Sequence, residues 1–142
     1  MTGVVVDASV SAAWFLPAES TPFTEAALQA TTTAEVWVPA LWLIEIGNLL
    51  LSAERRKRIG AAKRSELVEA ADRLQLNIDR EPVSMTRIDS IASRLGLTAF
   101  DAAYLELALR RSLPLASVDA ALIAALAPAG VQAFRPDLSP PL

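Results

Sequence analysis

The sequence contains no cysteine and no histidine. Without cysteine there is no disulfide framework, no thiol nucleophile and no thiolate metal site, and the reducing cytoplasm is the expected compartment. Without histidine, a catalytic proton transfer has to be carried out by a carboxylate or by hydroxide on a metal ion.

Long apolar runs are also missing. A membrane-spanning helix needs roughly 20 uninterrupted apolar residues, and the best candidate, residues 40–51, is shorter and carries Glu45 and Asn48. We interpret it as a buried helix, so no membrane contact is expected. A secretory signal is not expected either, because the first apolar run, residues 4–6, stops at Asp7.

Positive charge is scarce overall, since the formal net charge is −3. That balance argues against a general nucleic-acid-binding protein, which normally has a basic surface. The positive charge is nevertheless uneven, with one basic run made of Arg55, Arg56, Lys57 and Arg58. Such a run is either a solvated helix end, where cations complement the helix dipole, or a patch that contacts phosphates.

Hydrophobic residues make up 53% of the 142 residues, which is more than a soluble domain usually contains. A chain of this length forms one sizeable core and does not divide comfortably into two. We therefore expect a single domain over residues 1–135, followed by a loose tail, residues 136–142, that contains three prolines. The surplus of apolar surface predicts a homodimer or a tightly bound companion protein.

Short β-branched runs alternate with stretches of helical composition. Strands are predicted at residues 4–6, 36–38, 76–78, 115–117 and 131–134. Helices are predicted at residues 8–16, 21–28, from 39 to the basic run, and at 65–74, 83–95, 98–111 and 120–126. This alternation predicts a three-layer α/β/α sandwich with a mostly parallel sheet of about five strands. Sites in such sheets form at the carboxyl ends of the strands.

Four acids stand inside apolar segments: Asp7, Glu45, Asp101 and Asp119. They can meet at one rim of the predicted sheet, because each follows a predicted strand or lies near the start of a helix. Each aspartate also has a simpler explanation. Asp7 can cap the helix that follows it, and Asp101 can form a capping box with Thr98. Asp119 can oppose the dipole of the helix that it opens.

Glu45 has no such explanation, because apolar residues surround it on its predicted helix. It needs either an arginine partner or a metal ion. Two like charges about 4 Å apart repel by on the order of 4 kcal/mol at an effective dielectric of about 20, whereas a bound Mg²⁺ or Mn²⁺ removes that repulsion. We therefore expect the four acids to hold such a cation. Ser9, Asn48 and Ser117 are candidate supporting residues around it, unless they only cap helices or face solvent.

Four segments carry these acids in order along the chain: the Asp-Ala-Ser sequence at residues 7–9, and residues 43–48, 97–104 and 114–119. Together they resemble the PIN-domain family, and most closely the VapC toxins of bacterial and archaeal toxin–antitoxin pairs. The resemblance spans nearly the whole chain. Each segment alone is a weak signal, whereas the four in this order are fairly specific.

The resemblance implies a toxin that acts as a Mg²⁺- or Mn²⁺-dependent endoribonuclease. Its catalytic and metal-holding acids correspond to Asp7, Glu45, Asp101 and Asp119, with Ser117 where the family more often has threonine. In this interpretation the acids hold one or two ions that activate a water for attack on an RNA phosphodiester, and the basic run contacts the RNA backbone. The resemblance also implies a VapB-like antitoxin whose C-terminal segment occludes the site, and a homodimer.

Two other functions remain open on the sequence alone. An aspartyl-phosphate phosphatase or a phospho-receiver domain also places an aspartate after its first strand, but it needs a second acid close to Asp7, where Val6 and Ser9 stand. A non-catalytic α/β module that binds a partner through its surplus apolar surface is the other alternative. Metal-dependent RNA cleavage distinguishes the nuclease from both.

Overall fold

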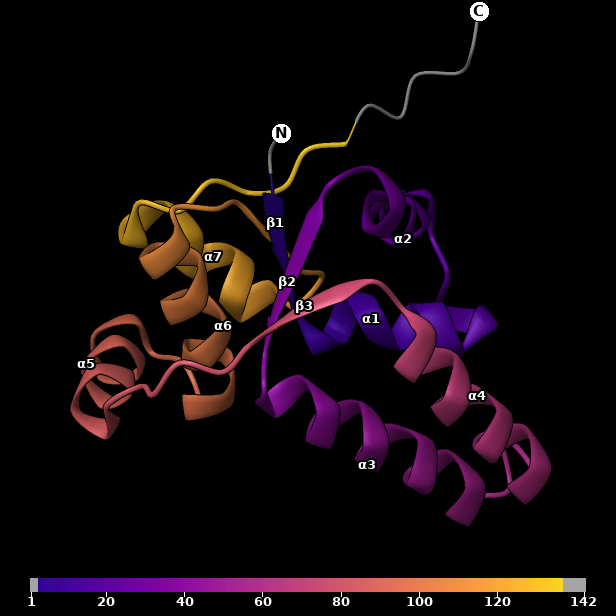
Figure 1. Ribbon diagram of the computed structural model, residues 1–142. Coiled ribbons are helices and arrows are strands. Elements are labelled where there is room, and N and C mark those ends of the chain that lie inside the picture. The colour runs from indigo at the N-terminus through magenta and orange to yellow at the C-terminus, as the bar shows by residue number, and fades with distance from the viewer. Residues whose placement is uncertain (1–2, 137–142) are drawn as a thin grey trace, which may run out of the picture.

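A parallel sheet runs through the centre of the computed structural model, which describes residues 3–136 (Figure 1). Its strands are β1 (Gly3–Val6), β2 (Glu35–Pro39), β3 (Leu76–Asp79) and β4 (Leu115–Ala116). They are hydrogen-bonded in the order β3-β2-β1-β4, and every pair is parallel. The α/β class, with a parallel sheet between helices, is confirmed.

The helices are α1 (Ala8–Phe15), α2 (Pro22–Thr33), α3 (Leu41–Arg55), α4 (Ala61–Arg73), α5 (Met85–Leu95), α6 (Ala99–Arg111) and α7 (Ala120–Ala129), with a short 3₁₀ turn at Pro17–Glu19. In Figure 1, α5, α6 and α7 lie on one side of the strands, and α1 and α2 lie on the other. α3 and α4 form a hairpin below and beside the sheet, in which α4 has no buried residue. The expected three layers are therefore present, with one helical hairpin at their margin.

The predicted last strand at residues 131–134 is reduced to a single parallel bridge between Leu115 and Ala133. Leu115 also accepts a hydrogen bond from the Phe134 N–H at 3.0 Å. β4 is only two residues long, and the Phe134 ring packs edge-to-face on Phe23 of α2 at 5.9 Å between ring centroids. The sheet therefore has four strands where the sequence predicts about five, because the short β4 offers little edge for further pairing.

Helix α3 buries only one face. Trp42, Ile46 and Leu50 recur at four-residue spacing and pack into the main core. Ile44 lies between them in sequence and is 71% exposed. The expectation of a buried helix over residues 40–51 is therefore correct for one face only, and the same apolar sequence supplies an exposed apolar surface.

β1 lies at the point where the strand order reverses. The chain runs outward from β1 through β2 to β3, and then returns to place β4 on the other side of β1. In open parallel sheets, the crevice at such a reversal, outside the carboxyl ends of the strands, is the usual ligand site. Asp7 directly follows β1 and Ser117 directly follows β4, so both lie at this crevice.

None of the helices within residues 3–136 is long and apolar enough to cross a membrane. The predicted loose tail, residues 136–142, lies outside the described residues from position 137 onward.

Candidate functional site

Asp7 is tightly held at the crevice. It is 3% exposed, and its Oδ1 accepts hydrogen bonds from the Ser9 hydroxyl at 2.7 Å and from the Val10 N–H at 3.0 Å. Its Oδ2 accepts from the Ser117 hydroxyl at 2.5 Å. The bond from Val10 is the helix cap that the sequence suggests. Capping and a position at the crevice are therefore not alternatives, because one side chain does both.

Burial raises the pKa of the Asp7 carboxyl above its ordinary value. The hydrogen bonds from Ser117, Ser9 and the Val10 N–H act in the opposite direction, and the charge of Asp101 raises the pKa further. Because the net direction of the pKa is upward, the protein destabilises the ionised form of Asp7 relative to water.

Glu45 lies half-buried in the second turn of α3. Its Oε1 accepts a hydrogen bond from the Tyr104 hydroxyl of α6 at 2.6 Å. Burial raises the pKa of Glu45, and the Tyr104 hydrogen bond lowers it. The charges of Asp101 and Asp7 raise the same pKa, which shows that the three carboxylates lie within reach of one another's fields.

Asp101 and Asp119 stand at the starts of α6 and α7. The Asp101 N–H donates to the Thr98 hydroxyl at 3.1 Å, which is one half of the suggested capping box. Burial, followed by the charge of Asp119, raises the pKa of Asp101. Asp119 is the N-cap of α7 and accepts from the Leu122 N–H at 2.9 Å. Both acids therefore have local roles and also couple to each other.

Two of the three candidate supporting residues contact the acids. Ser9 and Ser117 both donate to Asp7. Each hydroxyl also accepts a backbone N–H from the segment just before α7, at 3.1 Å and 3.0 Å. These bonds tie the start of α1 to the start of α7. Asn48 is exposed on α3 and takes no part in them.

No lysine or arginine within residues 3–136 forms an ion pair with any of the four acids. The arginine partner that the sequence allows for Glu45 is thus replaced by a neutral tyrosine. We call Asp7, Glu45, Asp101 and Asp119 the unpaired acids. Their negative charge is balanced by no cationic side chain of the described chain.

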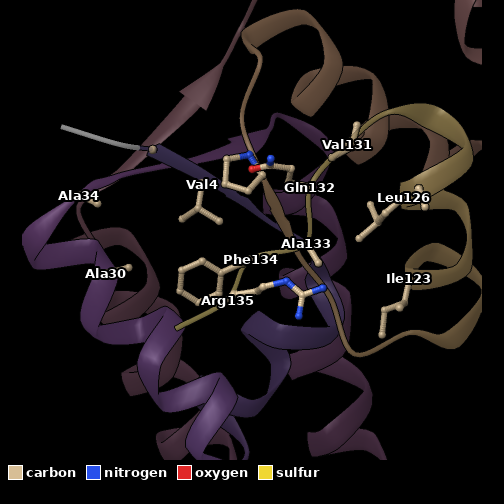
Figure 2. A pocket seen from close by; sticks show the side chains of 13 residues that line it. Val4, Ala30, Ala34, Ile123, Leu126, Val131, Gln132, Ala133, Phe134 and Arg135 are labelled. Atoms are coloured by element: carbon tan, nitrogen blue, oxygen red, sulfur yellow. The ribbon is translucent and has the colours of Figure 1, made fainter. Parts of the chain in front are cut away.

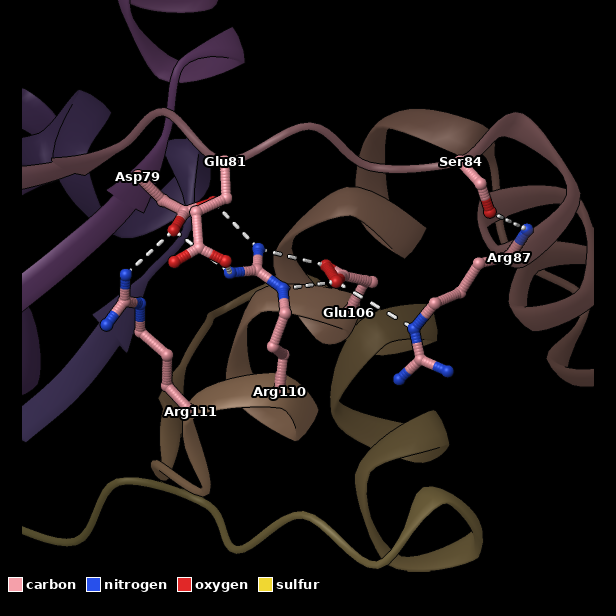
Figure 3. A network of polar contacts seen from close by, with 7 residues as sticks. All are labelled: Asp79, Glu81, Ser84, Arg87, Glu106, Arg110 and Arg111. Carbon is pink, nitrogen blue, oxygen red and sulfur yellow. Dashed lines mark hydrogen bonds and ion pairs between the residues drawn. The ribbon is translucent and has the colours of Figure 1, made fainter.

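A second group of acids is paired with arginines (Figure 3). Asp79, at the end of β3, accepts from Arg110 at 2.7 Å and 3.0 Å and from Arg111 at 2.9 Å. Glu106 is 2% exposed and pairs with Arg110 at 2.7 Å and with Arg87 at 3.8 Å. We call these five residues the arginine-paired cluster. Its hydrogen bonds, that of Arg110 first, hold the pKa of Asp79 below its ordinary value.

The unpaired acids fit a hard divalent cation in their chemistry, because carboxylate oxygens are its preferred ligands and no cationic side chain competes. Their arrangement is more open than a coordination sphere: within residues 3–136, no three acidic side chains stand close enough together to hold one ion. Closing the set around an ion therefore requires side-chain rotation.

The basic run lies at the other end of α3 from Glu45. Arg55 closes the helix and Arg56, Lys57 and Arg58 follow it, and all four are exposed. None of them forms an ion pair within the described chain. The ten residues from Glu45 to Arg55 correspond to about 15 Å along the helix axis.

A groove of about 800 Å³ opens at the start of β1, whereas Asp7 follows its end (Figure 2). Figure 2 shows Phe134 and Arg135 between Ala30 of α2 and Ile123 of α7. None of the unpaired acids lines this groove, so it is separate from the crevice.

Sequence reasoning missed Tyr104, the partner of Glu45. Tyr104 is the only tyrosine of the chain and stands three residues after Asp101. A buried tyrosine needs a hydrogen-bond partner for its hydroxyl, and residues three apart share a helix face. These two signals together could have identified it.

The fold is shared with solved structures, among them the following two. One is PAE2754 from Pyrobaculum aerophilum, with a TM-score of 0.69 and 22% identity over 87% of this chain and 79% of that one. The other is FitAcB from Neisseria gonorrhoeae, with a TM-score of 0.66 and 20% identity over 94% of this chain and 97% of that one. At these identities the likeness establishes the fold alone. No curated protein matches the chain by sequence.

The sequence profile of the PIN domain matches residues 4–127. This range includes β1 from residue 4, β2 to β4, the seven α-helices up to residue 127, and all four unpaired acids. PIN domains are generally nucleases that use divalent metal ions. The match covers far more than half of the chain, and it agrees with the strand order and the acid-lined crevice: the chain belongs to the PIN-domain family.

Proposed function

We propose that this chain is a divalent-metal-dependent endoribonuclease, the toxin of a toxin–antitoxin pair, and that Asp7, Glu45, Asp101 and Asp119 hold its Mg²⁺ or Mn²⁺. The observation that carries the proposal is electrostatic. The charges of neighbouring acids raise the pKa of Asp7, of Glu45 and of Asp101, and no lysine or arginine within residues 3–136 pairs with any of the four acids. In a family of nucleases, a divalent cation is the counter-charge that such a set lacks.

A bound Mg²⁺ or Mn²⁺ supplies Lewis acidity toward the phosphate and lowers the pKa of a coordinated water. The protein contributes the fixed parts of the site. Asp7 is locked by three hydrogen bonds, so it serves as the anchoring ligand. Asp7 and Asp119 are the N-caps of α1 and α7, and Asp101 lies in the first turn of α6. The positive dipole ends of these helices favour the approach of an anionic RNA phosphate.

Proton uptake falls to the half-buried carboxylates, because the chain has no histidine. Asp101 is half-buried, and its carboxylate is less enclosed by hydrogen bonds than that of Asp7. We assign to Asp101 the part of general base, because Glu45 has one oxygen bonded to Tyr104 and offers the other to the ion.

The basic run is our candidate for the RNA backbone contact. It is exposed and lies about 15 Å along α3 from Glu45, so it can meet a phosphate a few nucleotides from the scissile bond. Its distance from the unpaired acids also keeps it from neutralising them. Removing its charge is expected to weaken RNA binding and to reduce the salt dependence of that binding, while leaving the chemical step unchanged.

The exposed face of α3 is our candidate for a protein partner. Ile44 and Leu51 lie seven residues apart on one exposed helix side, and Leu43 is beside them. Apolar surface of this kind favours coverage by protein. We propose that a homodimer forms, that a VapB-like antitoxin covers the site, and that the toxin acts on RNA in the cytoplasm. Co-expression with the product of a neighbouring small gene tests the antitoxin.

The test of the proposed function is cleavage of RNA by the purified full chain with Mg²⁺, with Mn²⁺ and with EDTA. We expect cleavage only with the cations, and a loss of at least about 100-fold in Asp7→Asn and in Glu45→Gln. Asp89→Asn is the matched control, because Asp89 is an exposed acid of α5 outside the crevice. It is expected to cleave at the wild-type rate.

Cleavage that persists in EDTA, or at the wild-type rate in Asp7→Asn, would contradict the proposal. An absence of cleavage under every condition, combined with tight binding of a second protein, would favour the non-catalytic interaction module. Formation of a stable acyl-phosphate with a phosphodonor would favour the phosphatase or receiver alternative.

A further inference from the structure

The hydrogen bond between Tyr104 and Glu45 joins a core residue to a site acid. Tyr104 is 1% exposed and belongs to the main hydrophobic core. Its hydroxyl donates to Glu45 Oε1 at 2.6 Å, a short distance of the kind found when the acceptor is a carboxylate. Tyr104 therefore connects the packed interior of α6 to the half-buried acid on α3.

Tyr104 is a fixed point, whereas Glu45 is not. An aromatic ring surrounded by core side chains is held in one rotamer by close packing. A glutamate has several rotatable bonds, and the charges of Asp101 and Asp7 destabilise its ionised form. Without a donor at Oε1, the ionised Glu45 would gain by turning toward solvent and away from these two acids. The tyrosine opposes that rotation.

The phenol remains a donor under all working conditions. Burial raises the pKa of Tyr104, and the hydrogen bond to Glu45 raises it further. The hydroxyl keeps its proton and directs it at Oε1. Within residues 3–136, Glu45 Oε2 accepts no hydrogen bond from a side chain or N–H, so one oxygen is held and the other is free.

We propose that Tyr104 is a positioning residue, which holds Glu45 by Oε1 so that Oε2 is offered to the divalent cation. This inference rests on the proposed metal site and names a residue that acts on the ion through one of its ligands. Partners that orient metal ligands typically account for about 10- to 100-fold in metal affinity.

Asp7 is supported differently, which gives a contrast within the same site. The Trp42 indole N–H donates to the Ser11 hydroxyl at 2.9 Å, and that hydroxyl donates to the Asp7 backbone carbonyl at 2.8 Å. This chain of bonds fixes the backbone of Asp7, while its carboxylate is held by Ser9, Ser117 and the Val10 N–H. Among the residues that the structure describes, Tyr104 is thus the aromatic residue that donates a hydrogen bond to a site carboxylate.

The test is isothermal titration calorimetry of MnCl₂ into the full chain without RNA. Tyr104→Phe keeps the ring in the core and removes only the hydroxyl, so the fold is expected to persist. We expect its Kd for Mn²⁺ to rise about 10- to 100-fold. Trp14→Phe is the control, because it removes a comparable aromatic N–H donor, bonded to the Thr24 carbonyl at 3.0 Å, away from the crevice. Its Kd is expected to match that of the wild type.

A double-mutant cycle separates positioning from a general structural effect. If Tyr104 acts through Glu45, adding Tyr104→Phe to Glu45→Gln changes the Kd for Mn²⁺ much less than it does in the wild type. Additive losses would overturn the inference, and so would an unchanged Kd in Tyr104→Phe alone, while the proposed function would stand. Absence of Mn²⁺ binding by the wild type would instead overturn the metal site itself, and the inference with it.

Discussion

The arginine-paired cluster and the unpaired acids are two solutions to the same problem in one small fold. Both place carboxylates at or near the ends of strands and bury some of them almost completely. Arg110 and Arg111 lower the pKa of Asp79, whereas burial raises the pKa of Asp7. The protein thus stabilises the ionised form of Asp79 and destabilises that of Asp7.

From this difference we infer that the arginine-paired acids are structural, and it supports our proposal that the unpaired acids are functional. The arginine-paired cluster joins the end of β3 to α6, and Arg111 also stacks over the Trp37 ring of β2 at 3.5 Å. Its charges are matched inside the chain, so nothing further is needed. Within residues 3–136 no lysine or arginine pairs with the unpaired acids, and this is the basis of our proposal that they bind a cation from solution.

The largest expected effect comes from breaking the arginine-paired cluster. Asp79→Ala removes the carboxylate on which Arg110 and Arg111 converge and leaves two partly buried cations without their main partner. We expect a loss of about 3 kcal/mol in the free energy of unfolding, measured by urea denaturation. Asp89→Ala, at an exposed position, is the control and should unfold near the wild-type midpoint. A stable Asp79→Ala variant would show that the pairing is unimportant.

The next effect is the response to metal. Mg²⁺ at about 100 times its Kd is expected to raise the free energy of unfolding of the wild type by ~2.7 kcal/mol. Asp7→Asn should lose this gain, and Asp79→Asn should keep it, since only the first touches the unpaired acids. Thermal denaturation with Mg²⁺ and with EDTA measures the difference. Equal gains in both variants would mean that the ion binds elsewhere.

Much of the fold could be predicted because its signals are local. The β-branched runs become β1 to β4, and Gly96 and Gly130 end their helices with positive φ. Helix α2 continues beyond the predicted residue 28 to Thr33. Threonine has a weak preference for helices. In α2, however, the Thr31 hydroxyl donates to the Leu28 carbonyl at 2.7 Å, so its hydrogen-bonding capacity is used within the helix.

The rest depends on tertiary contacts that spacing does not show. Glu106 also stands in an apolar stretch, yet it pairs with Arg110 four residues later. An acid among apolar residues is therefore either paired or unpaired, and only the three-dimensional arrangement distinguishes the two. In the same way, Pro39 ends β2 and α3 begins at Leu41, where the sequence predicts a helix starting at the proline.

Removing a charge from the unpaired acids should raise the free energy of unfolding of the metal-free protein, whereas removing one from the arginine-paired cluster should lower it. Because burial destabilises the ionised form of Asp7, Asp7→Asn is expected to stabilise the metal-free protein by about 1 kcal/mol. Urea denaturation in EDTA measures this gain. A destabilised Asp7→Asn would indicate that the carboxylate's hydrogen bonds with Ser9 and Ser117 outweigh its burial.

The smallest effect is a pH dependence of opposite sign in the two groups. Because the pKa values of Asp7, Glu45 and Asp101 are raised in the folded protein, these groups favour the folded state at low pH. In EDTA this contribution to the free energy of unfolding is lost as the pH rises from about 4 through the raised pKa values. The lowered pKa of Asp79 means that its contribution is present above about pH 4 and is lost as pH falls through its lowered value.

Unfolding free energies across pH check these signs. In EDTA, the advantage of Asp7→Asn over the wild type should grow as pH rises, and the deficit of Asp79→Asn should shrink as pH falls below about 4. Parallel pH curves for the two variants would show that the groups do not differ in the way described.

The central claim is that the unpaired acids together bind a divalent cation at the end of β1. The most direct measurement is the anomalous scattering of Mn²⁺ in a crystal of the full chain grown with MnCl₂. The account predicts one or two peaks in contact with the carboxylates of Asp7 and Glu45, with Asp101 or Asp119 completing the set. An empty crevice at saturating Mn²⁺, or a peak bound only at other residues, would contradict it.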